Sequence, residues 1–116
     1  MKKILLIATG GTIASLPSAK GLKPELSPNG LLEFVPEIQK YCQAEAVQAY
    51  NIDSTNLTPD HWRTLASLIK ENYAKYDGFV ICHGTDTMAY TAAALSYLIQ
   101  DSPKPIVLTG AQKPIW

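Results

Sequence analysis

The sequence has 116 residues, a common length for one domain, and apolar residues make up 47% of it, which excludes a disordered or low-complexity chain. Ten basic and ten acidic residues give a formal charge of zero, and no basic run occurs. The composition therefore predicts a single domain over residues 1–116 with no nucleic-acid partner and no membrane partner.

The first residues resemble the start of a signal peptide, but the apolar run at residues 4–8 ends at Thr9-Gly10 and is too short for one. No other segment approaches the ~20 apolar residues of a membrane span. The two cysteines, Cys42 and Cys82, do not make a disulfide framework, and we expect both to be reduced and partly buried. These features predict a cytoplasmic protein.

Short apolar runs alternate with helical patterns along the chain, which is typical of a parallel α/β sheet. Residues 3–8 form a continuous apolar run, as in a strand that is covered on both faces. Residues 15–26 hold two prolines and a glycine and are predicted to be a loop, mobile without substrate. Ser27 and Pro28 predict the start of a short helix reaching Ile38, which Pro36 kinks or ends.

The second half of the chain continues the alternation. Residues 46–52 are predicted to be a strand, and Thr58-Pro59-Asp60 opens the clearest helix, with apolar residues at helical spacing up to Tyr73. His61, in the first turn of this helix, is expected to face solvent. Residues 78–82 are predicted to be the third strand, residues 86–100 a helix, and residues 105–109 the fourth strand. On the helix at 86–100 we expect four side chains to face the core: Met88, Tyr90, Leu95 and Leu98.

This order of elements predicts an α/β fold: a three-layer, doubly wound, mainly parallel sheet with the flavodoxin-like strand order 2-1-3-4. The sequence ends a few residues after the fourth strand, where a helix should cover it, so we expect a truncated domain. The fourth strand should lie at or near an edge of the sheet. Because an exposed apolar edge recruits another chain, we expect a dimer or larger assembly, or disorder near Trp116.

In an open α/β sheet, ligands bind beyond the carboxyl ends of the strands. Four segments rich in hydroxyls and glycines fall there: residues 9–12, 53–55, 83–87 and 109–112. A threonine hydroxyl becomes a nucleophile when a base removes its proton, and neighbouring glycines leave N–H groups free for a developing oxyanion. Neither histidine is placed as that base, because His83 ends a buried strand, where a structural hydrogen bond is its expected role.

Two of these segments contain sequence motifs that are specific to one family. Residues 9–14 (Thr-Gly-Gly-Thr-Ile-Ala) and 83–88 (His-Gly-Thr-Asp-Thr-Met) strongly resemble the two signature motifs of the bacterial-type asparaginases. Residues 53–55, 76–80 and 109–112 fall where that family has related segments. The resemblance runs over essentially the whole chain and is closest to the cytoplasmic, type I branch, whose members hydrolyse L-asparagine to L-aspartate and ammonia.

The resemblance implies a role for each matching residue. Thr12 would be the nucleophile that attacks the side-chain amide, and Thr85 and Asp86 would form a second catalytic cluster, with Asp86 holding the α-amino group. Gly11 and Thr85 would donate backbone N–H groups around the substrate, and Ser54 would bind the α-carboxylate. The implied substrate contacts are Gly11, Ser54, Thr55, Gly84 and Ala111. The resemblance implies no cofactor, no metal, L-asparagine as substrate, and a homo-oligomeric parent, either dimer or tetramer.

Two departures from the family pattern bear on activity. Many members carry a tyrosine in the loop after the first motif, whereas no tyrosine occurs here between Thr12 and Tyr41. The family's catalytic lysine lies beyond Thr109 and outside this sequence, as does the C-terminal domain that completes the neighbouring subunit's site. We therefore expect the isolated 116-residue chain to be inactive.

Other interpretations of the same residues remain open. The glycines at 10 and 11 also suit a plain strand-to-helix turn, or a phosphate cradle in a flavodoxin-like flavin-binding module, although no aromatic pair is present to hold a flavin. The chain is alternatively a non-catalytic folding or association fragment. A related enzyme is the asparaginase-like subunit of a transfer-RNA amidotransferase, which normally carries an extra N-terminal domain.

Overall fold

The computed structural model of the chain describes residues 1–10, 16–18, 21–23, 28–33 and 35–113. Four parallel strands form its main sheet, in the order β4 (Gln43–Gln48), β1 (Lys3–Ala8), β5 (Gly78–Cys82) and β6 (Ile106–Thr109). In chain order this is 2-1-3-4, so the predicted topology is confirmed, and β6 lies at an edge.

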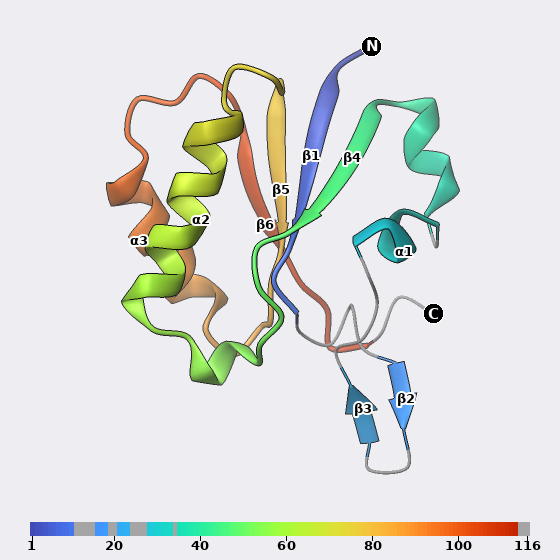
Figure 1. Ribbon diagram of the computed structural model, residues 1–116, viewed down its shortest axis with the longest axis vertical. Helices are drawn as coiled ribbons and strands as arrows, with labels where there is room; N and C mark the ends of the chain where they lie inside the picture. Colours follow the sequence, from blue (N-terminus) through green and yellow to red (C-terminus); the bar gives the residue numbers. More distant parts are fainter. Residues whose placement is uncertain (11–15, 19–20, 24–27, 34, 114–116) are drawn as a thin grey trace.

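Helices cover both faces of this sheet, as Figure 1 shows. Helices α2 (Pro59–Asn72) and α3 (Met88–Leu98) lie on one face, and α1 (Pro28–Glu33) with the 3₁₀ helix η2 (Pro36–Lys40) lies on the other. Right-handed crossovers require this division, because the connections through α2 and α3 advance in one direction along the sheet and the connection through α1 runs in the opposite one. The three-layer prediction is confirmed.

The two faces of the sheet are unequally buried. Under α2 and α3 lies the larger core, which contains Ile7, Phe79 and Ile81 from the strands and Leu65 and Ile69 from α2, all at most 1% exposed. The face toward α1 carries a smaller cluster around Leu6, Ala8 and Cys82. On the same face of β6, Val107 is 50% exposed. The site-bearing ends of β1 and β5 are therefore held mainly by the core beneath α2 and α3.

The second strand lies earlier than predicted. It spans Gln43–Gln48, not residues 46–52, and it pairs with β1 from Lys3 to Ala8. The prediction followed the apolar residues, but an edge strand alternates polar and apolar side chains. Glu45 is such a polar position: it is exposed, accepts a hydrogen bond from the Tyr76 hydroxyl at 2.5 Å and pairs with Lys3 at 3.2 Å.

Two other predicted segments differ. The predicted loop at residues 15–26 contains a small antiparallel hairpin, β2 (Leu16–Ser18) and β3 (Gly21–Lys23), and its remaining residues lie outside the described part. The predicted mobility of this loop stays a prediction. The single helix expected to reach Ile38 is two pieces, α1 and η2, and η2 has a proline at its start, as the break at Pro36 suggested.

Helix α3 is shorter than the predicted 86–100, and the prediction of which of its side chains face the core is only partly correct. Leu95 is buried, as expected, and Met88 is half-buried, but Tyr90 is 67% exposed and Leu98 is 38% exposed. The expectation was wrong for those two because the helix carries apolar residues on every side, so its sequence does not mark one inner face. None of the described helices is long and apolar enough to cross a membrane.

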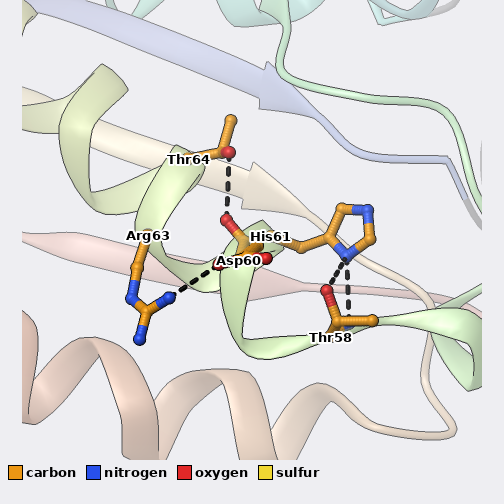
Figure 2. A network of polar contacts seen from close by, with 5 residues as sticks. All are labelled: Thr58, Asp60, His61, Arg63 and Thr64. Atoms are coloured by element: carbon orange, nitrogen blue, oxygen red, sulfur yellow. Dashed lines mark hydrogen bonds and ion pairs between the residues drawn. The ribbon is translucent and has the colours of Figure 1, made fainter.

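A histidine caps the N-terminus of α2, at the end of the segment that follows β4 (Figure 2). The backbone N–H of Thr58 donates to Nδ1 of His61 at 2.9 Å, and the Thr58 hydroxyl lies 3.0 Å from the same nitrogen. The His61 ring also packs edge-on against Tyr50, with centroids 4.9 Å apart. His61 is thus half-buried, so it faces solvent only in part. It takes the place that glutamate or glutamine holds in a capping box.

We expect His61→Ala to lower the free energy of unfolding by about 1–2 kcal/mol, because it removes both the capping acceptor and the ring contact. His61→Gln keeps an acceptor at this position and should recover about half of that loss. Urea denaturation followed by circular dichroism measures both. The control is Thr64→Ala, which removes an exposed α2 hydroxyl bonded to the Asp60 carbonyl at 3.0 Å and should change stability by less than about 0.5 kcal/mol. An equal loss in the control would contradict the capping role.

Candidate functional site

The loops that follow β1, β4, β5 and β6 meet at one end of the sheet because parallel strands end at the same edge. The Thr9 hydroxyl donates to the carbonyl of Cys82 at 2.6 Å, joining the loop after β1 to the end of β5. The backbone N–H of Ile52 donates to the Thr9 carbonyl at 3.1 Å, which brings the segment after β4 to the same place. The backbone N–H of His83 donates to the Thr109 carbonyl at 2.8 Å and fixes the end of β6 beside that of β5.

After β4 the chain forms a short 3₁₀ helix, η3 (Ser54–Asn56), which Asp53 caps. Both the backbone N–H and the hydroxyl of Thr55 donate to the Asp53 carboxylate, each at 3.0 Å. This turn directs the exposed Thr55 side chain toward Asp53 and leaves Ser54 on the inner side, where it is only 4% exposed. The aspartate therefore selects which of the two neighbouring hydroxyls enters the site.

Ser54 packs directly against the loop after β5. A Cβ atom added at Gly84 would lie 2.8 Å from both Cβ and Oγ of Ser54, so only glycine permits this approach. The Thr87 hydroxyl donates to the Ser54 carbonyl at 2.9 Å and fixes the contact from the other side. Within the described part of the chain, the Ser54 Oγ is buried and has no hydrogen-bond partner. Buried hydroxyls are nearly always paired, so this one is a candidate ligand contact.

Thr85 lies on the loop after β5 and contacts the loop after β6. Its hydroxyl accepts a hydrogen bond from the side-chain amide of Gln112 at 2.9 Å. A Cβ atom at Gly110 would come within 3.1 Å of the Thr85 methyl group and 2.5 Å of the His83 carbonyl oxygen, so the two loops touch at backbone level. Thr85 is half-buried in this position, and the next residue, Asp86, is exposed.

His83 and Cys82 lie beneath these loops and belong to the frame of the site. The His83 ring is 1% exposed, with Nδ1 2.6 Å from the Gly84 carbonyl oxygen and Nε2 2.8 Å from the Thr91 hydroxyl. The predicted structural role of His83 is confirmed. Burial raises the pKa of the Cys82 thiol to about 11, so the group stays protonated and is no nucleophile. Both cysteines are free, Cys82 buried and Cys42 half-buried.

The structure brings together three of the predicted site residues: Ser54, Gly84 and Thr85. Thr55 and Asp86 adjoin them in sequence, and the half-buried Ala111 follows Gly110. Gly11 and Thr12 lie outside the described residues, so the predicted closeness of Thr12 to Thr85 stays a prediction. The hydrogen bond from the Thr87 hydroxyl to the Ser54 carbonyl was not predicted from the sequence. Among the described residues, no group of three or more histidine, cysteine, aspartate or glutamate side chains is placed to hold a metal ion.

Comparison with known proteins gives concordant matches. The family model described as "Asparaginase, N-terminal" matches residues 3–116. An L-asparaginase from Thermococcus kodakarensis is 42% identical over 114 residues, which cover 97% of this chain and 35% of that protein. A glutamyl-tRNA(Gln) amidotransferase subunit from Methanosphaera stadtmanae is 44% identical over 115 residues, which cover 97% of this chain and 26% of that protein.

Solved structures agree with the sequence matches. The thermostable L-asparaginase from Thermococcus kodakarensis superposes with a TM-score of 0.88 at 42% identity, covering 97% of this chain and 35% of that one. L-asparaginase I from Vibrio cholerae superposes with a TM-score of 0.85 at 38% identity, covering 98% and 35%. The chain therefore spans about a third, or less, of the length of the relatives it matches.

Proposed function

The chain belongs to the asparaginase family, and on that premise we propose that it forms the nucleophile-bearing part of an enzyme that hydrolyses L-asparagine to L-aspartate and ammonia. The observation that carries the proposal is the buried Ser54 hydroxyl, which lies against Gly84 and has no hydrogen-bond partner among the described residues. A serine hydroxyl in such a place is a ready donor to a carboxylate, which every α-amino acid substrate presents.

The surrounding groups suit the rest of an amino-acid substrate. Asp86 is exposed and supplies a negative charge for the α-amino group, one residue from Thr85. The Thr85 backbone N–H has no acceptor among the described residues and suits a substrate oxygen. Ala111, with its small side chain on the loop after β6, leaves room for the amide end. Each role follows the family resemblance and is consistent with the contacts described above.

The reaction would proceed through Thr12. Its hydroxyl oxygen attacks the side-chain amide carbon and the hydroxyl proton passes to a base. The base gives a proton to the amide nitrogen as the carbon–nitrogen bond breaks, so that ammonia leaves and an acyl ester remains on Thr12. Water then attacks the ester carbon, restores the threonine hydroxyl and releases aspartate. Thr85 and Asp86 complete the catalytic cluster. The described site residues contribute binding groups, whereas the only histidine among them, His83, is fully engaged beneath the loops.

We also propose that the 116-residue chain hydrolyses asparagine negligibly by itself. The described site contains no lysine or free histidine to act as base, and general-base help is typically worth ~10²–10⁴ in rate. Activity would need a polypeptide of the length that the relatives have, here called the full-length enzyme. We propose that this enzyme is a cytoplasmic homo-oligomer, a dimer or a tetramer, with L-asparagine as its small-molecule substrate and with no cofactor.

Ammonia release from L-asparagine tests the proposal. We expect turnover by the full-length enzyme and none by the 116-residue chain. We expect Ser54→Ala to raise KM about tenfold or more, because a hydrogen bond to a charged group contributes about 1.5–3 kcal/mol. The control is Ser96→Ala, which removes an exposed hydroxyl bonded to the Ala93 carbonyl on α3 and should leave KM unchanged. An unchanged KM in Ser54→Ala would contradict the binding role.

A second candidate function is that of a transfer-RNA amidotransferase component, favoured by the 44% identity to the Methanosphaera protein. Asparagine and glutamine differ by one methylene, and that difference is worth only ~1–3 kcal/mol in a pocket. Ammonia released from glutamine only in the presence of glutamyl-tRNA(Gln) would support this candidate. Release from asparagine without tRNA supports the asparaginase. The flavin- or phosphate-binding alternative loses its support, because the family model covers the loop on which it rested.

A further inference from the structure

We propose that Trp62, Thr91 and His83 are positioning residues that aim the backbone N–H of Thr85 at the substrate. The proposal rests on the proposed function, since it assigns the buried groups that orient one donor of the same site. Trp62 comes from α2, Thr91 from α3, and His83 directly follows β5, at the start of the loop that carries Thr85. They act through the Gly84–Thr85 peptide.

The hydrogen bond at the Gly84 end of this chain of residues has a fixed direction. The Gly84 carbonyl is purely an acceptor, so the His83 Nδ1 at 2.6 Å must carry a proton and donate to it. The Trp62 indole N–H donates to the Thr91 hydroxyl oxygen at 2.9 Å. With that oxygen already accepting from Trp62, the Thr91 hydroxyl proton is free to go to His83 Nε2, which lies 2.8 Å away. The network thus fixes a proton on His83 Nδ1, and with a neutral ring the Thr91 hydroxyl donates to Nε2.

The consequence for Thr85 follows from the planarity of the peptide. In a trans peptide the C=O and N–H groups point in opposite directions, and the described part of the chain has no cis peptide. The His83 ring holds the Gly84 C=O toward the layer of α2 and α3. The Thr85 N–H of the same peptide must therefore point away from that layer, and no described residue accepts its hydrogen bond.

Burial distinguishes this arrangement from an ordinary surface network. Thr91 is 0% exposed and His83 is 1% exposed, inside a core whose other members are mainly apolar. Replacing both partners of a buried hydrogen bond by apolar groups of the same shape can be nearly neutral, so stability alone does not explain a polar set here. The polar set does one thing that an apolar trio could not do. It holds one peptide, next to Ser54, in a single orientation.

Enzyme kinetics and histidine nitrogen spectra test the proposal in the full-length enzyme. Thr91→Val removes the donor to His83 and should lower kcat/KM for L-asparagine about tenfold, the loss expected when one charge-assisted hydrogen bond is misaligned. Thr91→Ser keeps the hydroxyl and should restore kcat/KM to within about twofold. Trp62→Phe keeps the donation from Thr91 to His83 and should lower kcat/KM by no more than about threefold. Thr64→Val, which removes a hydroxyl from the exposed side of α2, is the control and should leave kcat/KM unchanged.

Three results would overturn the proposal. These are wild-type kcat/KM in a folded Thr91→Val variant, a Thr91→Ser variant as impaired as Thr91→Val, and a His83 ring protonated on Nε2 in the wild type. The nitrogen spectra of ¹⁵N-histidine-labelled protein decide the last point even if Thr91→Val fails to fold, and His83→Gln identifies the His83 signals by their loss. A wild type that does not turn over asparagine would overturn the proposed function instead. The His83 tautomer, and the chemical shift of the Thr85 backbone amide in Thr91→Ser, would then still test the positioning role.

Discussion

Replacing Gly10 with alanine is expected to lower the free energy of unfolding by about 3 kcal/mol or more, the largest effect on stability that we predict. Gly10 follows the end of β1 with φ at 103°, a backbone region that other residues adopt only under strain. An added Cβ would also lie 2.7 Å from the backbone carbonyl oxygen of Ile52. That segment cannot easily retreat, because the Ile52 N–H donates to the Thr9 carbonyl at 3.1 Å.

Gly78→Ala is the matched control for this prediction. Gly78 begins β5, and a Cβ there would meet the Pro105 carbonyl oxygen only at an ordinary contact distance of 3.5 Å and two side-chain atoms, Ile4 Cδ1 and Pro105 Cγ, each at 3.1 Å. These groups can shift by a few tenths of an ångström, so the expected cost is about 1 kcal/mol. Urea denaturation of the two variants under the same conditions gives the comparison. A Gly10→Ala variant no less stable than Gly78→Ala would show that the loop after β1 is looser than its contacts indicate.

The order of the strands and the placement of helices on both faces of the sheet were predictable because they depend on strong, local signals. Continuous apolar runs mark β1 and β5, which are covered on both faces, and right-handed crossovers then fix the layers. The edge strand β4 gave a weaker signal. Its residues alternate between polar and apolar, with exposed Gln43 and Glu45. The stretch that follows it continues the pairing with isolated backbone hydrogen bonds, from Ala49 to Ala8 and from Ile52 to Thr9.

The place of the site was predictable, but its internal contacts were not. Ligand-binding loops follow the carboxyl ends of parallel strands, and this rule located Ser54 and Thr85 from the sequence. Their assembly depends on how close two backbones come, such as the approach of Ser54 to Gly84, and no periodicity reports that distance. One contact did have a signal. An aspartate followed at the second position by threonine favours a side-chain turn, so the bond from Thr55 to Asp53 could have been expected.

Burial on α3 illustrates a further limit. In a helix with one apolar stripe, the stripe indicates which face is buried. Helix α3 is apolar on every side, so the sequence does not distinguish Leu95 from Leu98, although they are 4% and 38% exposed. The polar residue Thr91 proves to be the most deeply placed side chain of the helix, at 0% exposure. It was not singled out from the sequence because a buried threonine is recognised only by its partners, Trp62 and His83.

The largest effect on activity is expected from Thr12→Ala, which should lower kcat of the full-length enzyme for L-asparagine by about 10³-fold or more. Alanine offers no oxygen to form the acyl ester, so hydrolysis would need direct attack by water, for which the site holds no dedicated base among the described residues. The binding groups are separate from the nucleophile. Ser54 lies on the segment after β4, and Asp86 lies on the loop after β5.

This separation makes the prediction specific. The affinity for L-aspartate, measured by calorimetry, should stay within about threefold of the wild type in Thr12→Ala, whereas ammonia release should fall to the assay background. Thr12→Ser keeps a hydroxyl and should retain a measurable part of the rate. Ordinary turnover by a purified Thr12→Ala enzyme would assign the nucleophile to another residue, and the half-buried Thr85, whose hydroxyl accepts a hydrogen bond from Gln112, would then be the first to test. Loss of both turnover and aspartate binding would instead indicate that Thr12 shapes the pocket, and the acyl-ester mechanism would have to be tested by trapping the intermediate on wild-type Thr12.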